Sequence, residues 1–98
     1  MPDVRSVAAS YGVRVELADL GDWATVTLVA EYDPDGPVIR VNERALSKGD
    51  ARRDAIDHAI AHELYHHREA IGEIPHIADR IARELAADAF AGALVRAR

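Results

Sequence analysis

Apolar residues recur along the chain with two different spacings, and the changes of spacing divide it into elements. In the first segment, apolar side chains lie three and four positions apart, at Val4, Val7, Ala8 and Tyr11. This spacing places them on one face of a helix. Asp3 is a suitable N-cap for that helix, and Gly12 is well placed to end it. The pattern therefore predicts a short helix over residues 3–12.

The next segments have the composition of strands. Residues 13–17 alternate apolar and charged side chains, as a half-buried strand does. Residues 23–32 are rich in β-branched and aromatic side chains, and residues 37–42 carry Val38, Ile39 and Val41. The turn-forming sequence Asp33-Pro34-Asp35-Gly36 separates these two strands. Because the proline before Val38 cannot donate to a ladder, we expect the third strand at a sheet edge.

Two later segments return to helical spacing. Residues 50–70 can be capped by Asp50 and are followed by Gly72. The apolar stripe expected on this helix comprises Ile56, Ile60, Leu64 and Ile71. After the break at residues 73–75, a last helix of about twenty residues is expected to begin at His76 or Ile77. The elements predict an α+β fold in the order helix, three strands, two helices.

The last helix carries acidic residues within its expected buried stripe. The stripe, at spacings of 4, 3, 4, 3 and 4, comprises Ile77, Ile81, Glu84, Asp88, Ala91 and Val95. Such a seam is typical of a helix packed on a partner helix. Buried carboxylates are costly unless they are paired or bind a metal ion, so Glu84 and Asp88 need an explanation.

The sequence His62-Glu63-Leu64-Tyr65-His66 supplies that explanation. Its pattern is HExxH, which places both histidines on one face of a helix, one turn apart. His62 and His66 can bind one metal ion, and Glu63 can reach a water in the ion's open position. Glu84 can be the third ligand. Asp88, one turn further on, can accept the remaining N–H of a bound histidine, most simply His62.

Three other histidines compete for a role. His58 lies one turn before His62, but a row of three histidines spans about 11 Å of helix. A zinc–nitrogen bond is about 2 Å, so one ion cannot reach both ends of that row. We expect His58 at the surface or beside a ligand, and His67 in a packing role. His76 has two open interpretations, a loop or capping role and stabilisation of an oxyanion.

Composition narrows the classes of function. A chain of 98 residues is expected to form one domain over residues 1–98. The net charge of -5 and the lack of a basic run argue against direct binding of nucleic acid. Without cysteine, a metal ion must be held by histidine and carboxylate. No apolar run suits a signal peptide or a membrane span, so we expect a cytoplasmic protein.

The spacing also resembles a known arrangement. HELYH followed by Glu84-Leu85-Ala86-Ala87-Asp88 is similar to the gluzincin pattern, HExxH with a downstream ExxxD. More narrowly, Glu84 to Ala91 resembles the ExxA(N/D)xFA pattern of ImmA/IrrE-type metallopeptidases, and YGVRVE, VIRVN and RRDAIDHAIAHE follow the family's upstream order. The chain departs from the family at Tyr65, where glycine is common, and at Leu94-Val95-Arg96, where the family often has Leu-Met-Pro.

This resemblance implies a minimal zincin-like fold, in which a small three-stranded, mostly antiparallel sheet packs on the HExxH helix and a C-terminal ligand helix. It implies one zinc ion held by His62, His66 and Glu84, with Asp88 behind His62. Glu63 would be the general base in hydrolysis of a peptide bond. The implied substrate is a regulatory protein, such as a helix-turn-helix repressor.

Two further hypotheses remain open at this stage. The chain could be a non-catalytic, zinc-stabilised module that binds a protein, of an antitoxin-like or repressor-binding kind. It could also be a structural domain without metal. For the hydrolase, residues 38–42 are expected to form the cleft edge, where an extended peptide substrate adds a strand.

Overall fold

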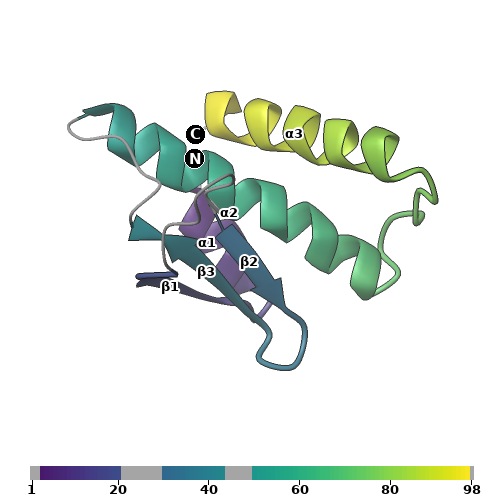
Figure 1. The fold of residues 1–98 in the computed structure, drawn as a ribbon, viewed down its shortest axis with the longest axis horizontal. Coiled ribbons are helices and arrows are strands. Elements are labelled where there is room, and N and C mark those ends of the chain that lie inside the picture. The colour runs from purple at the N-terminus through teal and green to yellow at the C-terminus, as the bar shows by residue number, and fades with distance from the viewer. Residues whose placement is uncertain (1–2, 21–29, 44–49, 98) are drawn as a thin grey trace.

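The elements of the computed structural model follow the expected order (Figure 1). The structure describes residues 3–20, 30–43 and 50–97, and the side chains of residues 50 and 51 are not described. The elements are α1 (Val4–Ser10), β1 (Arg14–Ala18), β2 (Ala30–Asp33), β3 (Val38–Asn42), α2 (Asp50–Ala70) and α3 (Arg80–Ala97). The α+β class is therefore confirmed. The expected capping by Asp50 and most of the strand expected over residues 23–32 lie outside the described residues.

Both ends of α1 form as the sequence predicts. The Asp3 carboxylate accepts a hydrogen bond of 2.7 Å from the Ser6 N–H, and this contact lowers the pKa of Asp3. Gly12 follows the helix with a φ of 73°, a conformation that favours glycine. The N–H groups of Gly12 and Val13 donate to Ala9 and Ala8, which closes the last turn of the helix.

The sheet is mixed, not mostly antiparallel as expected. Its order is β1-β3-β2, with β1 parallel and β2 antiparallel to β3. The prediction that β3 lies at the edge is therefore wrong. Pro37 stands just before the first paired residue and contributes its carbonyl, which accepts from the Arg14 N–H at 3.1 Å. The missing proline N–H thus leaves no gap in the ladder, and the most apolar strand occupies the centre.

The three helices and one face of the sheet enclose the core, to which α3 contributes Ala91. Residues of α1, β3 and α2 form one buried cluster around the fully buried Ile39, Ile60 and Leu64. On the other face of the sheet, the Arg40 guanidinium lies 3.3 Å from Glu31 and 3.6 Å from both Glu16 and Asp33. The alternation of faces along β3 thus separates the core from a charged surface.

α3 forms a further layer, alongside α2 and away from the sheet (Figure 1). It begins at Arg80, later than expected, because Asp79 provides the cap. The Asp79 side chain accepts from the Ile81 N–H at 3.1 Å, and its carbonyl accepts from the Arg83 N–H at 2.9 Å. Ile77 therefore precedes the helix and cannot belong to its buried stripe.

The buried line of α3 also differs from the expected seam. Ala87 and Ala91 are fully buried, whereas Ile81 is 73% exposed. The side chains of Glu84 and Asp88 are 44% and 57% exposed. The premise that these carboxylates are buried is therefore wrong, because small alanines form the contact with α2. The two acids flank that contact at the edge of the interface.

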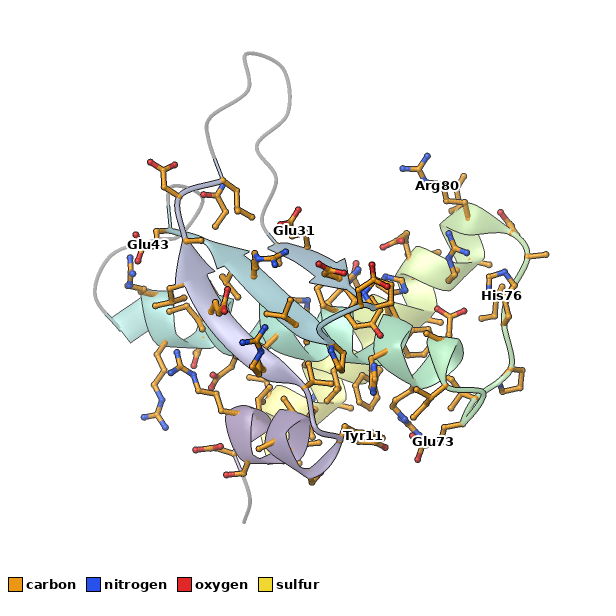
Figure 2. The ribbon with its side chains drawn as sticks, turned by 90° about the horizontal axis from the view of Figure 1, so that it is seen from below. Tyr11, Glu31, Glu43, Glu73, His76 and Arg80 are labelled. Carbon is orange, nitrogen blue, oxygen red and sulfur yellow. The ribbon has the colours of Figure 1, made fainter. Side chains whose placement is uncertain are left out.

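Backbone and side-chain hydrogen bonds hold the turn that follows α2. Gly72 has a φ of 77°, and the N–H groups of Gly72 and Glu73 donate to the carbonyls of Glu69 and Arg68. The Glu73 carboxylate then accepts from the Tyr11 hydroxyl at 2.9 Å (Figure 2). It also accepts from Arg68 Nε at 3.2 Å. Ile71, expected in the α2 stripe, instead lies in this turn and is 54% exposed.

Within the described residues, none of the helices has the length and apolar character needed to span a membrane.

Candidate metal centre

Three of the side chains singled out in the sequence meet at one point. His62 and His66 stand one turn apart on α2, and Glu84 reaches them from α3. His62 Nε2 lies 2.8 Å from Glu84 Oε2 and 3.3 Å from His66 Nε2, and His66 Nε2 lies 3.5 Å from Glu84 Oε1. One ligand atom of each residue lies within 4.8 Å of the other two. The two helices thus bring two imidazoles and a carboxylate together.

Asp88 lies behind the first of these histidines. Its Oδ1 is 2.7 Å from His62 Nδ1, the ring nitrogen that does not face Glu84. With the Nδ1 proton donated to Asp88, Nε2 could offer its lone pair to a metal ion held between His62 and Glu84. His58 Nε2 lies further from the same oxygen, at 3.6 Å. His58 is thus a neighbour of Asp88 and stands outside the group of three.

Glu69 contacts the Nδ1 of His66, as Asp88 contacts the Nδ1 of His62. This role of Glu69 was not predicted from the sequence. Its side chain is only 6% exposed, and Oε1 lies 3.1 Å from His66 Nδ1. Burial acts to raise the pKa of Glu69, but hydrogen bonds from His66 and the Ile77 N–H outweigh it and lower that pKa. The spacing of three residues on one helix was the available signal. His76 also contacts Glu69, at 3.2 Å between Nδ1 and Oε2, from the loop before α3.

Glu63 lies next to the first histidine and lines two cavities beside the group of three. Burial raises the pKa of Glu63, and the nearby Glu84 and Glu31 act in the same direction, whereas His66 and His62 oppose them. A carboxyl with a raised pKa in a cavity is a suitable proton acceptor near neutral pH.

His67 faces the other way, as expected for a packing residue. It is 5% exposed, and its Nδ1 lies 2.6 Å from the Tyr32 hydroxyl on β2. Its ring also meets Tyr11 and Tyr32 edge to face. Burial lowers the pKa of His67, so the neutral ring is favoured. This contact holds β2 against α2 beside the three converging side chains.

Two cavities adjoin the centre. One, of about 270 Å³, is lined by residues that include Ala30, Ala59 and Glu63. The other, of about 340 Å³, is lined by Tyr32, Arg83 and the three converging side chains. β2 therefore borders both cavities through Ala30 and Tyr32.

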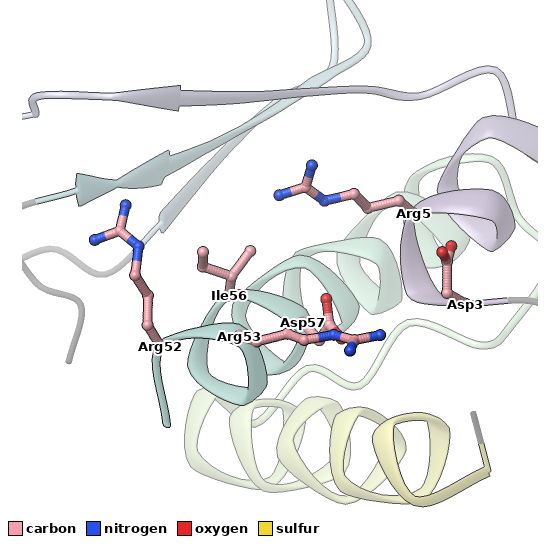
Figure 3. A pocket seen from close by; sticks show the side chains of 6 residues that line it. All are labelled: Asp3, Arg5, Arg52, Arg53, Ile56 and Asp57. Carbon is pink, nitrogen blue, oxygen red and sulfur yellow. The ribbon is translucent and has the colours of Figure 1, made fainter. Parts of the chain in front are cut away.

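A separate cavity of about 390 Å³ lies at the beginnings of α1 and α2 (Figure 3). Its lining brings together Arg5, Arg52 and Arg53 with Asp3 and Asp57, and it contains none of the histidines. Within residues 3–20, 30–43 and 50–97, the side chains that could hold a metal ion lie at the α2–α3 interface.

The donor set at that interface fits a borderline cation. Two imidazoles and one carboxylate are the ligands that zinc takes at sites with an open position. Calcium and magnesium prefer oxygen alone, so the two histidines argue against them. The three residues could thus hold a divalent metal ion of the zinc type.

Two imidazoles and a carboxylate meet across two helices, with a further carboxylate in an adjoining cavity, and such a group could hold a metal ion. A family model described as the IrrE N-terminal-like domain, Peptidase_M78, matches residues 8–95. The chain belongs to this family, and the predicted ImmA/IrrE-type resemblance is confirmed. Comparisons with curated proteins and with solved structures found no match.

Proposed function

We propose that this protein is a zinc metallopeptidase with a zincin-like fold. The observation that carries the proposal is the convergence of His62, His66 and Glu84 within 4.8 Å, with Glu63 in the adjoining cavity. Membership of Peptidase_M78 supports a peptidase of metal-dependent type. The three converging residues would hold one zinc ion.

In this proposal each residue has a distinct task. When bound, zinc would supply a Lewis acid for the scissile carbonyl and make a water molecule more acidic. Glu63 accepts a proton from that water and later delivers it to the leaving amine. Asp88 and Glu69 hold the rings of His62 and His66 through Nδ1, which keeps each Nε2 directed toward Glu84.

The sheet suggests where a peptide would lie. β3 is central, so the strand expected to receive a peptide must be reassigned. β2 is paired with β3 on one side and borders both cavities of the centre. An extended substrate that pairs with β2 would pass over Glu63 and the metal ligands. We propose a regulatory protein, such as a helix-turn-helix repressor in the cytoplasm, as the source of that substrate.

The test compares the parent protein with the Glu63→Gln variant. Each is expressed in cells, and new protein N-termini are identified by mass spectrometry. Cleavage products should appear with the parent alone, while both proteins retain about one equivalent of zinc. Glu16→Gln, which changes an exposed carboxylate on β1, is the matched control and should cleave like the parent.

Other results would support the alternatives. Identical N-termini with parent and Glu63→Gln, together with a retained partner protein, would identify a non-catalytic binding module. Less than about one tenth of an equivalent of zinc after loading would exclude a metal protein altogether.

A further inference from the structure

Arg83 stands beside the metal centre but takes no part in it. It precedes Glu84 on α3 and lines the 340 Å³ cavity that contains the proposed ligands. It also lines an adjacent cavity of about 230 Å³ together with His66, Glu69 and His76. Arg83 therefore borders both the cavity of the proposed metal ligands and the adjacent smaller cavity.

The guanidinium has an unused hydrogen-bonding capacity. Its Nε is buried and has no hydrogen-bond partner. In residues 3–20, 30–43 and 50–97, no carboxylate forms an ion pair with it. Three acids line the two cavities, Glu63 and Glu84 in the larger one and Glu69 in the smaller one. Glu84 faces His62 and His66, and Glu69 Oε1 lies 3.1 Å from His66 Nδ1. Glu69 Oε2 lies 3.2 Å from His76 Nδ1 and, like Arg83 Nε, is buried without a hydrogen-bond partner.

A guanidinium whose Nε is buried without an acceptor favours an anionic partner. Arginine stays protonated in proteins, so the partly buried Arg83 keeps its positive charge beside the cavity. A buried donor without an acceptor is unfavourable, and a charge-assisted bond to a carboxylate is among the strongest ways to satisfy it. The planar guanidinium also fits the two oxygens of a carboxylate.

We propose that Arg83 is a specificity residue that binds a carboxylate of the substrate in the 230 Å³ cavity. The group would be an aspartate or glutamate side chain next to the scissile bond, or the C-terminal carboxylate of the peptide. This inference rests on the proposed peptidase function, since it assigns a preference to the same site. Because the proposed ligand His66 also lines this cavity, we expect the acid close to the scissile bond.

The experiment measures peptide retention without cleavage. Zinc-loaded Glu63→Gln protein is mixed with random decapeptides, half with free and half with amidated C-termini, and retained peptides are sequenced by mass spectrometry. Peptides with the recognised carboxylate should be enriched about tenfold over peptides in which an amide replaces it, as one charge-assisted bond implies. The amide is Asn or Gln for a side chain and the amidated end for the C-terminus. Enrichment at one fixed internal position would identify a side chain, and enrichment of free over amidated ends would identify the C-terminus.

Variants on the same background assign the preference to Arg83. Arg83→Gln should abolish the enrichment, and Arg83→Lys should keep part of it because the charge remains. Arg80→Gln removes the same charge from an exposed position of the same helix and should retain the full enrichment. Thermal unfolding and zinc content of each variant show that it is folded and loaded.

Two outcomes would overturn the inference. The first is an acid enrichment that is equal with and without the Arg83→Gln substitution, and the second is the absence of any acid preference when Arg83 is present. Cleavage by protein with an intact Glu63 is measured separately. Arg83-dependent retention without cleavage would uphold the binding role of Arg83 and contradict the peptidase.

Discussion

The two proposed histidine ligands are each held from behind by a carboxylate, and the two carboxylates differ in origin. Asp88 reaches His62 from α3, whereas Glu69 reaches His66 from the same helix. Asp88 is 57% exposed and Glu69 is 6% exposed. The first contact therefore depends on the packing of two helices, and the second depends mainly on local helix geometry.

We predict that Asp88→Ala lowers zinc affinity about 10–100-fold, because His62 loses the contact that fixes its tautomer and ring orientation. Competition with a chelator measures this affinity. Asp35→Ala removes an exposed carboxylate from the turn before β3 and should leave zinc affinity unchanged. An unchanged zinc affinity in Asp88→Ala would show that the contact of Asp88 with His62 does not support metal binding.

Glu69 gives a second prediction at this scale. Glu69→Ala should also lower zinc affinity about 10–100-fold, since His66 would lose its partner at Nδ1. His76→Ala removes only the neighbour on the other oxygen and should leave the affinity near that of the parent. Equal losses in the two variants would show that the loop before α3, and not the His66 contact, is responsible.

At this scale the sequence is informative where the spacing lies within one helix. The four-residue interval fixes the relation of His62 to His66 without any knowledge of the fold. The placement of Glu84 and Asp88 needed an argument about burial, and its premise was wrong because both side chains are half-exposed. Arg83 had no signal in the sequence, because its unpaired Nε results from the packing of α3 against α2.

Among the elements, the α2–α3 contact is the one that sets the geometry of the centre. Ala87 and Ala91 are fully buried between the helices, and their small side chains allow the backbones to approach closely. Ile81 and Leu85 point to solvent, so the interface contains few large side chains from the first turns of α3.

We predict that Ala87→Leu destabilises the protein by about 1–3 kcal/mol, because the added carbons do not fit this contact. It should also weaken zinc binding, since Glu84 lies one turn away. Ala89→Leu adds the same atoms at an exposed position of the same helix and should change stability by less than about 0.5 kcal/mol. Urea unfolding measures both variants, and equal losses would contradict the assigned interface.

The turn after α2 gives a prediction of pH dependence. Hydrogen bonds from Tyr11 and then from Arg68 lower the pKa of Glu73 below its usual value of about 4.5. A folded-state pKa below the unfolded one means that the contact stabilises the protein above the unfolded value, and that the gain is lost as pH falls through the folded value. Glu73→Gln should therefore lower the urea midpoint at pH 7, and the difference from the parent should disappear in acid.

The matched variant for this test is Tyr11→Phe, which removes the hydroxyl that donates to Glu73. It should reduce the midpoint in the same pH range. A difference between parent and Glu73→Gln that persists below the folded pKa would point to an effect other than the carboxylate charge.

The strands show where prediction from sequence reaches its limit. Alternation and turn residues located β1, β3 and the turn between β2 and β3 to within about one residue. They could not reveal that β3 lies between β1 and β2, because strand order depends on which apolar strand buries both its faces. Val38, Ile39 and Val41 are all fully buried, which suits the centre of the sheet.

For the whole molecule, the proposed zinc ion would join two layers. We predict that zinc at one hundred times its dissociation constant stabilises the protein by about 2.7 kcal/mol, since it binds the folded state. Thermal unfolding with zinc and with a chelator measures this effect. Glu84→Gln removes the ligand contributed by α3 and should lose most of the gain, while an undiminished gain would place the ion elsewhere.

The attachment of α3 has a consequence for control of the proposed activity. Among the described elements, α3 packs on α2 and makes no other extensive contact. The later part of α3 packs Phe90, Leu94 and Val95 against the core. A movement of its first half away from α2 would withdraw Glu84, Asp88 and Arg83 together. A binding partner that moved this helix away from α2 would abolish the proposed activity without contacting a histidine. Faster amide hydrogen exchange confined to residues 80–97 would reveal this displacement.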